Sequence, residues 1–186
     1  AGHNVDLTQT AFKEGDGLQQ VLEGRTVQPL VVLDSHGRTY TVDAAEIPGG
    51  RGEGVPVSSL VELQNGAKVV AILTGEPQQH YMLANSGGYG FITKLSDMAS
   101  RIKAGKVLMT LDEGETVLPP LPVYAGSLIK PETKLVLAST ANRLLAFPLG
   151  DLKIMAKGRG LQLMSLAEGE ALAHMVVMSG AEFVVE

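Results

Sequence analysis

The chain contains three copies of one segment pattern, which recur at a spacing of roughly fifty residues. The copies are residues 30–40, 81–91 and 135–145, and each has an apolar run, a polar turn and a second apolar run. The turns consist mainly of Asp, Asn, Ser and Gly, which tolerate left-handed backbone or hydrogen-bond to their own main chain. Each copy therefore predicts a β-hairpin.

The segments that follow the hairpins also keep a common register. A basic stretch that contains glycine comes first, and Gly54, Gly105 and Gly160 in these stretches are 51 and 55 residues apart. A third apolar run, an acidic or amide turn and a further strand, such as residues 68–73, come next. This order predicts four strands per unit.

Units of this size usually stack radially as blades, because a single four-stranded unit cannot bury both of its faces. We therefore expect an all-β, propeller-like fold, and the 22 glycines and the absence of tryptophan agree with many short elements and tight turns. We interpret residues 1–186 as one repeat domain. Its approximate repeats are 30–73, 81–123 and 135–178, with partial blades at both ends, indicated by residues 13–18 and 181–186. The Pro-rich residues 118–123 are expected to form a stiff connection between blades.

Several chemistries are excluded or disfavoured. The chain has no cysteine, so it has no disulfide, thiolate metal site or cysteine nucleophile. Its four histidines share no metal-ligand spacing, and no phosphate-loop or dinucleotide-binding motif is complete. No apolar run is long enough to span a bilayer. These observations predict a cytoplasmic protein without metal or cofactor.

Short motifs at matching positions in the repeats resemble a known family. They are residues 88–91, 103–106, 118–120, 145–152 and 157–160. In this order and register they are similar to the C-terminal repeat domain of the bacterial topoisomerase IV A subunit, a relative of the gyrase A subunit. The resemblance extends over nearly the whole chain.

The resemblance implies a β-pinwheel, a propeller-like disc whose four-stranded blades exchange strands with their neighbours. It implies that a positively charged rim binds and bends duplex DNA for a type II topoisomerase, while catalysis, ATP hydrolysis and metal binding lie elsewhere in the enzyme. Implied partners are the ATPase subunit and the N-terminal catalytic part of the parent chain, in a bacterial, nucleoid-associated enzyme. Residues 46–52 lack the leading Gln and basic pair of the gyrase glycine-rich box, so the resemblance implies decatenation and relaxation rather than supercoiling.

Basic loops at equivalent positions of successive blades should lie along one rim, where they contact duplex phosphates without base specificity. The candidate DNA-binding residues are Arg38, Arg51, Lys94, Arg101, Lys103, Lys106, Arg143, Lys153, Lys157 and Arg159. The formal net charge of −5 and the acidic turns predict weak, salt-sensitive binding.

Two alternatives remain at the level of sequence. A propeller-type module that binds other proteins has a similar period, although kelch-like units usually contain tryptophan. An enzyme that uses a central propeller channel would need a convergent catalytic set, and the residue spacing indicates none.

Overall fold

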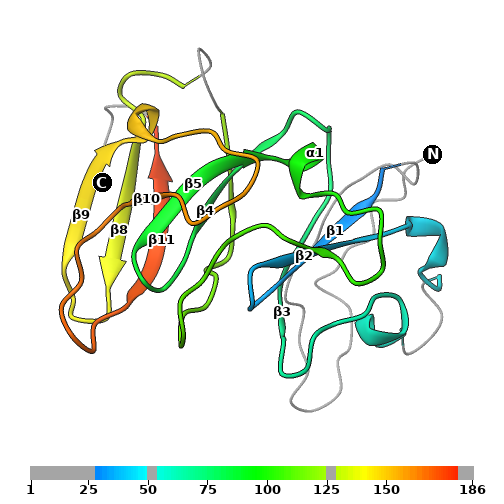
Figure 1. Ribbon diagram of the computed structural model, residues 1–186. Helices are drawn as coiled ribbons and strands as arrows, with labels where there is room; N and C mark the ends of the chain where they lie inside the picture. Colours follow the sequence, from blue (N-terminus) through cyan, green and yellow to red (C-terminus); the bar gives the residue numbers. More distant parts are fainter. Residues whose placement is uncertain (1–27, 50–53, 125–128, 180–186) are drawn as a thin grey trace, which may run out of the picture.

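Three antiparallel sheets lie side by side in chain order in the computed structural model, which describes residues 28–49, 54–124 and 129–179 (Figure 1). The first sheet has the order β3-β1-β2-β6, the second β10-β5-β4-β7, and the third β11-β8-β9. The strands of the first sheet are β1 (Leu30–Asp34), β2 (Arg38–Val42), β3 (Val69–Leu73) and β6 (Lys106–Val107). Those of the second are β4 (His80–Ala84), β5 (Tyr89–Lys94), β7 (Leu121–Val123) and β10 (Leu161–Gln162). Those of the third are β8 (Lys134–Ser139), β9 (Leu144–Pro148) and β11 (Leu172–Met178).

The three predicted hairpins are confirmed as β1–β2, β4–β5 and β8–β9. The first polar residue of each of the first two turns performs the same task. Oδ1 of Asp34 accepts the amide of Arg38 at 2.9 Å, and Oδ1 of Asn85 accepts the amide of Tyr89 at 2.9 Å. Side chains that bond to the nearby main chain in this way favour a tight turn over a longer loop.

Neighbouring repeats exchange strands. The first sheet takes β6 from the second repeat, where Thr39 pairs with Lys106. The second sheet takes β10 from the third repeat, where Gly90 pairs with Leu161. The expected propeller-like β-pinwheel of four-stranded blades is thus confirmed. In the third sheet, no strand of the described residues pairs with the outer side of β9.

The hydrophobic core lies between the sheets. Tyr81 and Leu83 of β4 belong to a cluster shared with the first sheet, whereas Met82 and Ala84 belong to a cluster shared with the third. Successive side chains of a strand point to opposite faces, so β4 is buried on both of its faces. The second sheet is therefore the middle layer of the described structure.

Short helices lie at the turns between strands. They are α1 (Leu95–Met98) and the 3₁₀ helices η2 (Ala44–Glu46), η3 (Val57–Ser59) and η5 (Leu149–Asp151). In the first repeat η3 lies where the repeat pattern predicted a third strand. The described residues contain no helix long and apolar enough to cross a membrane.

The prediction for the Pro-rich residues 118–123 was wrong. They do not connect two blades but form the outer edge of the second sheet, since β7 pairs with β4 and the amide of Leu118 donates to the carbonyl of Ala84 at 2.9 Å. Pro122 is compatible with this strand because an edge strand has one side without ladder partners. Residues 13–18 and 181–186, which indicated partial terminal blades, lie outside the described residues.

Candidate nucleic-acid interface

Two basic loops lie against the neighbouring repeat and are anchored there by backbone hydrogen bonds. At the end of α1 the carbonyl of Met98 accepts the Thr39 hydroxyl at 2.7 Å, and in the loop between α1 and β6 the carbonyl of Lys103 accepts the Glu62 amide at 3.0 Å. Both partners belong to the first repeat. These contacts hold the backbone of the loop in place while its basic side chains extend from it.

The loop between η5 and β10 is held in the same way by the second repeat. The carbonyl of Lys153 accepts the amide of Ile92 at 2.9 Å, and the amide of Met155 donates back to Ile92 at 2.8 Å. Further along, Gly158 exchanges backbone hydrogen bonds with the segment after β6, with Leu108 and Thr110. This loop therefore contacts both β5 and the segment that follows β6.

Two of the three glycines that set the sequence register lie where an exchanged strand passes close to the sheet that receives it. Gly105 has φ +64°, and a Cβ there would lie 2.4 Å from the carbonyl oxygen of Thr39. Gly160 has φ +89°, and its Cβ would lie 2.1 Å from the carbonyl oxygen of Gly90. Glycine is required at both positions because other residues rarely adopt this backbone and a side chain has no space. Gly54, the third member, has φ +74°, but no atom of the described residues lies within 4 Å of its Cβ position.

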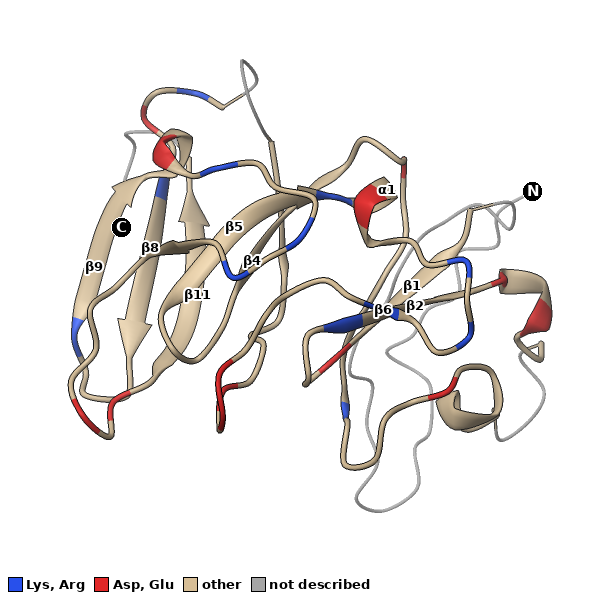
Figure 2. Ribbon diagram, in the orientation of Figure 1, with Lys and Arg blue, Asp and Glu red and all other residues tan. Residues whose placement is uncertain are grey.

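Six of the ten candidate DNA-binding residues lie on or beside these loops, and their basic side chains form no ion pair within the described part of the chain. Arg101, Lys103, Lys153 and Lys157 are exposed, and Lys94 and Lys106 are half-buried. In Figure 2 the blue segments near β5, β6 and α1 lie away from the red turns at the lower edge of the view. Arg51 lies outside the described residues.

Arg38 has a structural role. Its Nη2 donates to the carbonyl oxygens of Ala104 at 2.8 Å and Gly105 at 3.2 Å, and its buried Nε has no hydrogen-bond partner among the described residues. The guanidinium therefore binds the main chain of the exchanged strand just before β6. This contact stabilises the exchange and leaves the group little freedom to contact a phosphate.

Arg159 is surrounded by groups of the second repeat. It forms ion pairs with Asp112 and, at 2.8 Å, with Glu115, and its guanidinium carbon lies 4.2 Å from the ring centroid of Tyr89. The hydrogen bond to Asp112 is the main cause that raises the pKa of Arg159. The positive charge is thus compensated by two carboxylates and covered on one side by an aromatic ring.

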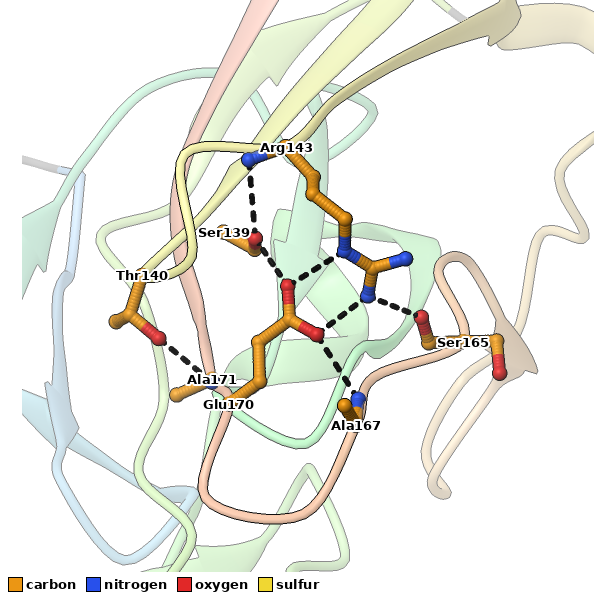
Figure 3. Close-up of polar contacts among 7 residues, drawn as sticks. All are labelled: Ser139, Thr140, Arg143, Ser165, Ala167, Glu170 and Ala171. Atoms are coloured by element: carbon orange, nitrogen blue, oxygen red, sulfur yellow. Dashed lines mark hydrogen bonds and ion pairs between the residues drawn. The ribbon is translucent and has the colours of Figure 1, made fainter.

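Arg143 is paired within its own repeat (Figure 3). Its Nε donates to Glu170 Oε1 at 2.8 Å, a second ion pair joins Nη2 to Oε2, and Nη2 also donates to the carbonyl of Ser165 at 2.8 Å. Glu170 further accepts the amide of Ala167 at 2.9 Å and the hydroxyl of Ser139. The Arg143 hydrogen bond, followed by these two donors, lowers the pKa of Glu170 to about 2.

The acidic turns also hold the hairpins of their own repeats in place. The sequence did not predict this role, and we had expected these turns only to repel DNA. Glu115 and Glu170 occupy the fourth position of equivalent turns, and each accepts the amide three residues before it and bonds to the hairpin of its own repeat. The first repeat has Ala67 at this position. The repeated Glu after the Gly was the available signal.

A metal site is not indicated by the described residues, in which no three His, Asp or Glu side chains are grouped so that they could hold an ion. The two loops offer amides and cations but no paired acid and base. Amides and cations in this arrangement are suited to binding a polyanion.

The fold and the exchanged basic loops define a class, the propeller-like repeat domains whose blades share strands. A family model described as the DNA gyrase C-terminal domain, beta-propeller, matches residues 35–74, 79–123 and 133–177. The chain therefore belongs to this family of gyrase-type C-terminal domains.

Individual relatives and a solved structure show which proteins of this family the chain resembles. Over the whole length of the chain, its sequence is 62% identical to the A subunit of DNA topoisomerase 4 from Neisseria gonorrhoeae, and the aligned part is 24% of that protein. The chain is 35% identical to the protein of the same name from Salmonella typhimurium over 95% of the chain, again 24% of the relative. The C-terminal domain of E. coli ParC superposes with a TM-score of 0.84 at 33% identity, over 95% of this chain and 73% of that one. The chain corresponds to the C-terminal β-pinwheel of the topoisomerase IV A subunit, as its motifs indicated, and spans about a quarter of these curated relatives.

Proposed function

We propose that the chain is a DNA-binding and DNA-bending domain of a topoisomerase IV A subunit, and that it performs no chemistry itself. The observation that carries this proposal is the equivalent docking of two basic loops on successive repeats, at residues 99–105 and 152–160. Equivalent loops on neighbouring blades present cations at intervals, which suits a duplex that follows the edge of the disc.

The proposed contact set differs from the ten candidates. Arg38, Arg143 and Arg159 are assigned to structure, because each guanidinium already has carbonyl or carboxylate partners. Phosphate contacts are assigned to side chains on or next to the two loops. These are Lys94, Arg101, Lys103, Lys106, Lys153 and Lys157.

The binding is proposed to be sequence-independent and salt-sensitive, since each phosphate neutralised releases counterions. Pairing of the acidic turns with Arg143 and Arg159 removes part of their repulsion. The remaining excess of 20 acidic over 15 basic residues still favours modest affinity.

In the intact enzyme we assign the domain to presenting duplex segments to the catalytic part of its own chain, which works with the ATPase subunit in the bacterial cytoplasm at the nucleoid. The absence of the leading Gln and basic pair before Gly49 favours decatenation and relaxation over supercoiling. The support for these assignments is the family of the chain and the names of its relatives.

The test is duplex binding by fluorescence anisotropy over a salt series, with unrelated duplex sequences. The wild type should give similar affinities for all of them and a linear fall of log K against log salt. The variant R101E/K103E/K106E should bind much more weakly while it remains folded. A matched control is K68E/K130E/K134E, since Lys68, Lys130 and Lys134 are also exposed but lie outside the two loops. Equal loss in both variants would refute the assignment to the loops.

A protein-interaction module remains the second candidate, and one observation favours it. Leu144 and Leu145 of β9 are 75% and 39% exposed, and the outer side of this strand pairs with no strand of the described residues. An uncovered apolar edge is a typical binding site for another strand. Absence of duplex binding at low salt would make this candidate the better one.

A further inference from the structure

The two basic loops and the exchanged strand β6 carry exposed aliphatic side chains directly beside their cations. Ile102, Val107 and Ile154 are 62%, 48% and 46% exposed, and each is adjacent in sequence to one of the proposed contact residues. A single exposed aliphatic residue needs no explanation, but this recurrence beside the cations does. The proposed DNA-binding surface is therefore mixed, basic and apolar.

Ile102 is the most exposed of the three and lies between two cations, Arg101 and Lys103. The backbone around it is well fixed. The amide of Gly105 donates to the carbonyl of Ile102 at 3.0 Å, and the amide of Ser100 donates to Thr41 Oγ1 at 2.8 Å. The side chain is thus held outward by an ordered turn rather than by a loose segment.

We propose that Ile102 enters the minor groove of duplex DNA while Arg101 and Lys103 bind phosphates on the two strands that border the groove. This inference rests on the proposed function. The minor groove is about 6 Å wide. The backbone at residues 101–104 forms bends and a turn, so the side chains of Arg101, Ile102 and Lys103 do not alternate between two faces as they would in a strand. The two cations can therefore face opposite walls of the groove with the aliphatic side chain between them.

An aliphatic side chain in this position has a physical role that a further cation lacks. Apolar side chains that insert from the minor groove partly unstack a base step and kink the duplex. The loops carry no aromatic residue that could serve as a stacking platform for single strands. The chemistry of Ile102 therefore fits a double-stranded partner.

The acidic neighbours of this loop restrict the direction of approach. A hollow beside it is lined by Asp43 and Glu46 together with Arg101, Ile102 and Lys103. The carboxylate of Asp43 accepts the amide of Ala45 at 2.9 Å, so it is already used locally. Phosphates are disfavoured in the hollow, and the duplex is assigned to the exposed tip of the loop.

The test measures duplex affinity and its salt dependence for Ile102→Ala and Lys103→Gln. I102A should bind about tenfold more weakly with an unchanged slope of log K against log salt, because an aliphatic group releases no counterion. K103Q should instead lower the slope by about 1. Val176→Ala, at a 52% exposed position on β11, is the matched control and should bind as the wild type does.

Competition identifies the groove. Netropsin, a minor-groove ligand, bound to an A·T-rich duplex should weaken wild-type binding and abolish the difference between wild type and I102A. Wild-type affinity in folded I102A would overturn this inference while leaving the proposed function intact. A difference that persists at the same size with netropsin bound would overturn the groove assignment. Failure of the wild type to bind any duplex would overturn the proposed function and this inference together.

Discussion

The second and third sheets begin with the same hairpin but differ in what covers its second strand. In the second sheet, β10 covers β5, Phe91 is fully buried, and a Cβ at Gly160 would lie 2.9 Å from its ring. In the third sheet, Leu145 occupies the position of Phe91, and it is 39% exposed. The difference teaches that the hairpin alone does not complete a blade. Phe91 is buried in the core shared with the first sheet and lies next to the exchanged segment at Gly160, whereas no strand of the described residues pairs with the outer side of β9.

The turn residues show the same difference. Gly37 and Gly88 have positive φ, and a Cβ at either would collide with the carbonyl of Met109 or Met164, which follow the exchanged strands. The third sheet has Asn142 there, with φ 59°. Asn tolerates left-handed backbone where no neighbouring strand approaches. The glycine is thus needed for docking as well as for the turn.

Truncation of the two equivalent core positions should give the largest effect. Phe91→Ala should destabilise the fold by roughly 3–5 kcal/mol, because it leaves a cavity beneath the exchanged strand. Leu145→Ala should cost about 1 kcal/mol, since that side chain remains partly in water. Urea unfolding of both variants checks this, and similar costs would show that β10 is not what buries Phe91.

Alanine at Gly160, where the exchanged strand comes close to β5, should have the next largest effect. Gly160→Ala places a methyl group against the carbonyl of Gly90 at φ +89°, so a loss of roughly 3 kcal/mol is expected. Gly169→Ala is the control, because Gly169 has φ +75° but open space around it, and about 1–2 kcal/mol is expected from backbone strain alone. Equal losses of stability in thermal unfolding would mean that close approach of the strand contributes nothing.

The ion pair of Arg143 with Glu170 should give the smallest effect, visible only in acid. The pKa of Glu170 is lowered in the folded state from 4.5 to about 2. Its stabilising contribution is therefore fully present above pH 4.5 and is lost as the pH falls through about 2. Glu170→Gln should show a flatter decline of stability across this range than the wild type, whereas Glu168→Gln in the same turn should follow the wild type. A parallel decline in E170Q and wild type would contradict the assignment.

The repeats, the hairpins and the register of Gly105 and Gly160 could be predicted from the sequence because they depend on local turn chemistry and on spacing. The structural roles of the arginines could not. Arg101 and Arg159 lie in equivalent loops, but of these two arginines it is Arg159 that forms ion pairs within the described part of the chain, with Asp112 and Glu115 of the preceding repeat. The exchanged strands determine which residues of neighbouring repeats come into contact. The composition of the chain does not specify these contacts.

The secondary structure of the Pro-rich residues was missed for a related reason. Prolines suggest a connection, but β7 is an edge strand on which Pro122 faces Tyr81. An edge position leaves one side of the strand free of ladder bonds, so a proline is compatible with it. The position of a strand within its sheet follows from tertiary pairing and not from propensity.

Hydrogen–deuterium exchange of the folded domain, with and without duplex DNA, tests most directly where the DNA lies. Slower exchange should be confined to Lys94, to Lys106 and to residues 99–105 and 152–160, the two loops that strand exchange places on neighbouring repeats. The acidic turns at residues 112–115 and 167–170 should exchange at unchanged rates. Protection of those turns or of β9, with the basic loops unaffected, would contradict the account.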